Sequence, residues 1–138
     1  MSYYINTNIH TSFEQAVQLV TESLKNEGFG VLTEINIHEK LKEKLGVSFR
    51  RYKILGACNP DYAYKALLKE DKIGTMLPCN IIVQELAHND IEIASVDPLA
   101  SMIAVENAAL VNIAKEIREK LTRVISSVQD KPHVGSYF

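Results

Sequence analysis

The chain has 138 residues, of which 46% are hydrophobic and 23% are charged, with 15 basic against 17 acidic side chains. This composition excludes a disordered or collagen-like chain and a polycationic nucleic-acid binder, and it predicts one compact domain. We expect that domain to span residues 1–128. Residues 129–138 lack any periodic apolar pattern and are expected to form a loose tail.

The N-terminal segment lacks the features of a targeting sequence. Polar residues, among them Asn6, Asn8 and His10, interrupt it, so no apolar run of a signal peptide is present. We therefore expect a cytoplasmic protein whose cysteines, Cys58 and Cys79, are reduced thiols. The longest apolar segment falls short of the ~20 residues of a membrane span, and no membrane association is expected.

The first third of the chain predicts two strands and two helices. Residues 3–8 alternate apolar and polar side chains, as in a strand. Thr11 and Glu14 have capping-box spacing, and apolar residues then follow at helical intervals until Gly28. Residues 29–37 predict a second strand, and residues 38–45 a short helix that ends at Gly46.

The middle of the chain predicts a third strand at residues 49–57 and then a helix. Asn59 suits the N-cap of that helix, and Pro60 suits its first turn. We expect this helix to turn three apolar side chains inward, namely Tyr64, Leu67 and Leu68. A loop at residues 73–77 leads to two strands, 79–86 and 91–96, which a tight turn joins into a hairpin.

Residues 98–128 predict one or two helices that cover the sheet. Their apolar stripe steps by three and four residues through Leu110, Ile113, Ile117, Leu121, Val124 and Val128. Residues 99–114 are apolar on nearly every side, and a domain of this size cannot easily cover such a helix alone. We therefore expect a homodimer, most simply with twofold symmetry.

The resulting order is β-α-β-α-β-α-β-β-α, which is typical of an α+β sandwich of two layers. A doubly wound parallel sheet is the competing architecture. The tight hairpin near residue 88 and the alternation in the first three strands favour a largely antiparallel sheet with one face exposed or paired.

The sequence does not support three possible functional motifs, namely a phosphate-binding loop, a histidine metal site and a nucleic-acid motif. Gly28-Phe29-Gly30 follows a helix and opens a strand, whereas a phosphate-binding loop follows a strand and opens a helix. The four histidines are scattered along the chain, so no metal site is expected. Residues 38–53 hold six basic and two acidic side chains, which we interpret as a solvated surface without a nucleic-acid motif.

The most informative candidate site residues lie at three points where a predicted strand ends or begins. They are Cys58, Asn59, Cys79, Asn80 and Asp97. If the third and fourth strands are antiparallel, Cys58 and Cys79 lie close together. If they are parallel, the two thiols lie at opposite ends of the sheet. Cys58 also precedes a helix N-terminus, which favours a thiolate.

Three functions remain open from the residues alone. The first is a binding module that takes a small polar or anionic ligand at the edge of the sheet that carries Cys58 and Cys79. The second is a redox enzyme or sensor that uses these two thiols as a pair. The third is a structural protein whose surface is its function. The sequence indicates no particular cofactor and no catalytic base beside either thiol.

Five segments in order resemble the bacterial and archaeal family 302 of domains of unknown function. They are Gly28-Phe29-Gly30-Val31-Leu32-Thr33, Lys42-Glu43-Lys44-Leu45-Gly46, Ile54-Leu55-Gly56-Ala57-Cys58-Asn59-Pro60, Leu77-Pro78-Cys79-Asn80 and Asp97-Pro98. The resemblance implies an α+β fold grouped with the TATA-box-binding-protein-like architectures, usually as a homodimer. It implies no activity, cofactor or substrate, and a shared architecture does not imply DNA binding.

Overall fold

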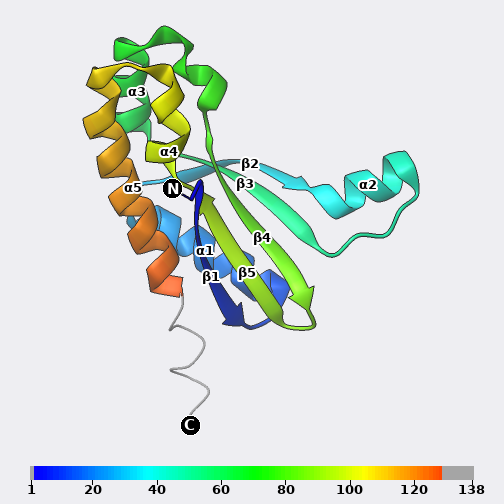
Figure 1. The fold of residues 1–138 in the computed structure, drawn as a ribbon. Helices are drawn as coiled ribbons and strands as arrows, with labels where there is room; N and C mark the ends of the chain where they lie inside the picture. Colours follow the sequence, from blue (N-terminus) through cyan, green and yellow to red (C-terminus); the bar gives the residue numbers. More distant parts are fainter. Residues whose placement is uncertain (1, 129–138) are drawn as a thin grey trace.

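A computed structural model describes residues 2–128 and contains a five-stranded sheet with helices (Figure 1). The predicted α+β class and element order are confirmed. The elements are β1 (Tyr4–His10), α1 (Phe13–Asn26), β2 (Gly30–Asn36), α2 (Ile37–Leu45), β3 (Tyr52–Cys58), α3 (Pro60–Lys69), η1 (Asp71–Met76), β4 (Cys79–Ala87), β5 (Asp90–Val96), α4 (Pro98–Met102), η2 (Ile103–Val105) and α5 (Ala108–Val128). The tail predicted at 129–138 lies outside the described residues.

The sheet is antiparallel throughout, with the strand order β1-β5-β4-β3-β2. The β4–β5 hairpin forms its centre, and β1 pairs with β5 although they are far apart in the sequence. Ala57 of β3 lies opposite Cys79 of β4, so the chain doubles back between these strands as the antiparallel alternative requires.

The core lies between one face of the sheet and the helices α1 and α5. Alternate strand residues such as Leu55, Ile81 and Ile93 are fully buried on that face, because successive side chains of a strand point to opposite sides. The helices meet them with their apolar stripes, and α1 and α5 also pack against each other. The predicted α5 stripe is confirmed, since every one of its members is at most 8% exposed.

The start of α1 differs from the predicted capping box. Ser12, not Thr11, is the N-cap, and its hydroxyl accepts a hydrogen bond of 3.1 Å from the backbone N–H of Gln15. The two hydroxyl residues are adjacent, and either can cap a helix. Only the backbone path from β1 into α1 decides between them.

The inward face predicted for α3 is wrong. Tyr64, Leu67 and Leu68 are exposed, and the residue that α3 buries is Ala66. Helical spacing identifies a stripe of residues but does not say which stripe meets the rest of the chain. The small side chain of Ala66 lets α3 approach the core closely.

Other predicted boundaries also change. The third strand, predicted at 49–57, spans Tyr52–Cys58, so residues 49–51 lie outside it. Of the loop expected at 73–77, residues 73–76 belong to the 3-10 helix η1, which buries Ile73. The apolar segment 99–114 is split into α4, η2 and α5, because Glu106 adopts a left-handed backbone with φ 56°. This break folds α4 back against α5, so part of the apolar surface that predicted a dimer is buried within the chain.

Replacing Gly56 in β3 tests how tightly this part of the sheet is packed. An added Cβ would clash with Thr33 Oγ1 and would lie 2.7 Å from Pro78 Cγ. We expect Gly56→Ala to lower the free energy of unfolding by about 1–3 kcal/mol, as overpacking does. Urea unfolding followed by circular dichroism measures the change.

The matched control is Gly30→Ala in the neighbouring strand, where an added Cβ meets no heavy atom within 4 Å. Equal stability of the two variants would contradict the close approach of β2, β3 and Pro78.

Candidate functional site

The second face of the sheet carries no helix of the described chain, and we call it the open face. Figure 1 shows α1 behind the sheet and α5 beside it, next to β1. Alternation brings to the open face Tyr4 of β1, Tyr52 and Ile54 of β3, Ile82 and Gln84 of β4, and Glu92 and Val96 of β5. A sheet face in water normally carries mainly polar side chains, so this mixture of aromatic, aliphatic and polar groups is unusual.

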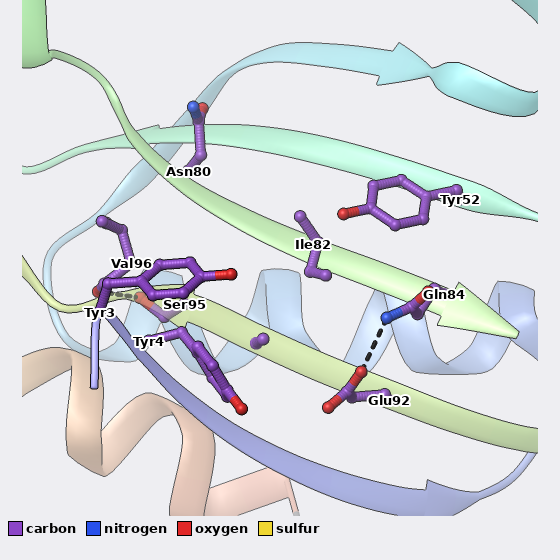
Figure 2. A pocket seen from close by; sticks show the side chains of 10 residues that line it. Tyr3, Tyr4, Tyr52, Asn80, Ile82, Gln84, Glu92, Ser95 and Val96 are labelled. Atoms are coloured by element: carbon purple, nitrogen blue, oxygen red, sulfur yellow. Dashed lines mark hydrogen bonds between the residues drawn. The ribbon is translucent and has the colours of Figure 1, made fainter. Parts of the chain in front are cut away.

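The open face is hollowed into a pocket of about 420 Å³. Tyr3 and Tyr4 border it on the side of β1, and Tyr52 borders it on the side of β3 (Figure 2). The rings of Tyr3 and Tyr4 meet edge to face, with centroids 5.0 Å apart. The remaining lining residues are Asn80, Ile82, Gln84, Glu92, Ala94, Ser95 and Val96.

A chain of hydrogen bonds fixes the polar side chains at one end of the pocket. Gln84 Nε2 donates to Glu92 Oε1 at 2.7 Å, and Asn6 Nδ2 donates to Glu92 Oε2 at 2.8 Å. Arg50 Nε donates in turn to Gln84 Oε1 at 2.7 Å. Both carboxylate oxygens of Glu92 therefore have a fixed direction, and acceptor capacity remains on each for a further donor.

The environment of Tyr52 favours the neutral form of its phenol. Partial burial raises the pKa of Tyr52, Arg50 opposes the rise, and Tyr3 and Glu92 add to it. The hydroxyl groups of Tyr3 and Tyr52 point toward each other across Ile82 (Figure 2). Tyr52 is therefore a neutral phenol that can both donate and accept a hydrogen bond in the pocket.

The predicted site residues are distributed over separate places. Asn80 lines the open-face pocket and also a smaller cavity of about 290 Å³, which Cys79 lines with η1 and α4. Asn59 borders a third, polar cavity, where its side chain lies beside the carbonyl of Glu27. Cys58 and Asp97 line none of these three cavities.

The two cysteines are free and lie near each other at the ends of paired strands. Because Cys79 lies opposite Ala57, strand alternation directs Cys79 toward the helices and Cys58 toward the open face. Burial raises the pKa of Cys79 to about 11, and the nearby Cys58 contributes to the rise. Cys79 is thus a buried neutral thiol at physiological pH.

Asp97 has a structural environment. It is 3% exposed, and its Oδ1 accepts a hydrogen bond of 3.0 Å from the backbone N–H of Leu99 at the start of α4. Its Oδ2 accepts a hydrogen bond of 2.9 Å from Arg118 Nε of α5. Both oxygens thus join the end of β5 to the helices.

Sequence reasoning missed most of the pocket. The predicted third strand contains Tyr52, but the residues that surround Tyr52 in the pocket, among them Tyr3, Tyr4, Gln84 and Glu92, come from other parts of the chain. A signal was available, because Asn80, Gln84, Asp90 and Glu92 stand at even-numbered positions of these strands, whereas the odd-numbered positions 81, 83 and 91 between them are apolar. That alternation shows that these strands have a second, non-core face.

The described residues contain no group of three or more His, Cys, Asp or Glu side chains placed to hold a metal ion. Nor does any helix within residues 2–128 combine the length and apolar character that a membrane crossing needs.

The different environments of the two thiols predict different reactivity. We expect iodoacetamide to modify Cys58 faster than Cys79 at pH 8, because Cys79 is 7% exposed and its thiol has a pKa of about 11. The rate at Cys79 should rise as the pH approaches 11. Mass spectrometry of the single variants Cys58→Ser and Cys79→Ser measures each thiol separately. Labelling of Cys79 at the rate of a free peptide thiol would contradict its burial.

Comparison with known proteins supports the fold. The crystal structure of an uncharacterized conserved DUF302 protein from Bacillus stearothermophilus has a TM-score of 0.87 and 29% sequence identity, covering 94% of this chain and 100% of that chain. No curated protein matches the chain. The family "Domain of unknown function DUF302" matches residues 5–128, which is most of the sequence. The chain therefore belongs to the DUF302 family.

Proposed function

We propose that this chain is a binding domain that takes a small ligand with a planar ring in the open-face pocket. The observation that carries the proposal is the convergence of three tyrosines on a hollow of about 420 Å³ that also holds the Gln84–Glu92 pair. A cavity of this volume, with apolar walls and a few oriented polar groups, is typical of a small-molecule site.

The side chains define the chemistry of the ligand. Tyrosine rings offer π faces to a planar or cationic group, and their hydroxyls can donate or accept hydrogen bonds. Glu92 is the charged residue of the lining, and both its oxygens are held by amide donors. Its negative charge supports a neutral or cationic ligand over an anionic one, so of the two ligand classes that the sequence left open we propose the uncharged polar class, extended to cations.

The proposed site shares one residue with the site that the sequence suggested, namely Asn80. A redox function of Cys58 and Cys79 has weaker support, because burial keeps Cys79 protonated and the strand directs the two side chains to opposite faces.

We also propose that the domain is a homodimer, and that it works in the cytoplasm, where the two free thiols would remain reduced.

Three probes of the same size and different charge test the ligand class: benzamidine, benzamide and benzoate. We expect benzamidine and benzamide to shift the amide resonances of residues 80–84 and 92–96 in ¹H–¹⁵N spectra, and benzoate to bind most weakly. Glu92→Gln should remove the preference for benzamidine over benzoate, because it removes the charge and keeps the shape. If all three probes leave the resonances of the pocket unchanged, the proposed site is wrong.

Tyr52→Phe tests the phenol in the pocket. We expect it to weaken the binding of benzamide about 2- to 10-fold, which corresponds to the loss of one hydrogen bond. Tyr64→Phe is the matched control, since Tyr64 is 66% exposed on α3 and lines none of the cavities described above. Equal affinities of the two variants would exclude a role for the Tyr52 hydroxyl.

A further inference from the structure

The segment 37–51, which we call the arm, stands away from the rest of the molecule. It consists of α2 and the connection to β3, at the far end of the β2–β3 ribbon (Figure 1). The helix α2 has nine residues and buries none of them. An isolated helix of this length is not stable in water, because the cost of nucleation exceeds what so few hydrogen bonds return.

The base of the arm contacts the rest of the chain, whereas its tip is exposed. At the base, His38 Nδ1 accepts a hydrogen bond of 3.0 Å from the backbone N–H of Tyr52. Arg51 also pairs with Glu14 and lies over the ring of Phe13. The tip exposes Leu45 at 70% and Val47 at 44%. The tip therefore offers apolar surface that the described part of its own chain does not cover.

This apolar surface is continuous with the open face. Phe49 of the arm is 40% exposed, and its ring lies 6.2 Å from the ring of Tyr52 between centroids. Tyr52 in turn lines the pocket, next to Ile82. The arm and the open face thus form one extended apolar surface with two parts, a projecting part and a hollow part.

The two parts also carry opposite charge. The arm holds five basic and two acidic side chains, and Lys42 and Lys44 form no ion pair within the described residues. The strands β1, β4 and β5 contain no lysine or arginine, and alternation places Asp90 and Glu92 of β5 on the open face. Lys42 and Lys44 of the arm and the carboxylates of Asp90 and Glu92 on the open face are therefore complementary in charge between two copies.

We propose that the domain is a twofold homodimer in which the arm of each copy lies across the open face of the other. This deepens the homodimer of the proposed function by naming the surfaces that meet. Leu45 and Val47 of the arm lose their contact with water, and the lysines of α2 approach Asp90 and Glu92. The arm also covers the open side of the pocket, so that each ligand site is completed by the second copy.

A second apolar surface competes with the arm for this role. Leu99, Ile103, Leu110 and Val111 line a groove of about 240 Å³ between α4 and α5, in the segment from which the sequence predicted a dimer. Both helices already pack within their own chain, however, and Leu110 is 1% exposed. The tip of the arm has no comparable packing within the described chain, so we assign the dimer contact to the arm.

Leu45→Asp and Ile103→Asp form a matched pair, because each side chain is 70% exposed in the single chain. By light scattering at micromolar concentration, we expect twice the chain mass of 15.5 kDa for the unaltered protein and for Ile103→Asp. We expect the mass of one chain for Leu45→Asp. Circular dichroism confirms that each variant is folded. A monomeric unaltered protein, a dimeric Leu45→Asp or a monomeric Ile103→Asp would each overturn the assignment.

A paramagnetic label locates the arm directly. Both native cysteines are replaced by serine, and a nitroxide is attached to the variant Lys44→Cys. This spin-labelled protein is mixed with an equal amount of ¹⁵N-labelled protein that carries no nitroxide. We expect broadening of resonances from residues 82–84 and 90–94 in the ¹⁵N copies, and none at 103–111. Broadening at 103–111, or none at all, would contradict the proposal. Titration of Leu45→Asp with benzamide shows separately whether a single copy retains the ligand site.

Discussion

The antiparallel register between β3 and β4 is the constraint on which the core and the site both depend. Ala57 lies opposite Cys79, and Gly56 opposite Asn80. Because side chains alternate along a strand, this register sends Leu55 and Ile81 to the helices and Asn80 to the open face. A slip of one residue would exchange the two faces, so burial of the core also fixes which residues can form a site.

Burial of the core does not explain the residue composition of the open face. A sheet covered by helices on one side needs only a polar second face, yet here tyrosines and aliphatic residues surround a hydrogen-bonded amide and carboxylate. The family and the Bacillus stearothermophilus structure establish the fold but not a chemistry. The proposed binding therefore depends on the side chains of this chain and not on its fold, because one fold serves many functions.

The proposed dimer explains the exposed helix α2 and the uncovered open face of the sheet together. None of the nine residues of α2 is buried, and the pocket opens to the side that α1 and α5 leave free. The charges of the two regions are opposite, although the whole chain is nearly neutral with a net charge of −2. In a dimer of two copies, one kind of contact would cover both α2 and the open face.

Local sequence signals determined the class of fold, the order of the elements and the stripe of α5 that reaches the core. Each depends on periodicity, on turn residues or on caps, all of which act over a few residues. Signals of this range cannot choose between equivalent stripes, so Tyr64, Leu67 and Leu68 were placed inward although the tertiary contacts bury Ala66 instead. Nor can they assemble the pocket, because Tyr3, Tyr52 and Glu92 become neighbours only when β1, β3 and β5 are arranged around β4. Strand pairing between distant segments is a property of the whole chain, and it alone decided where the candidate site lies.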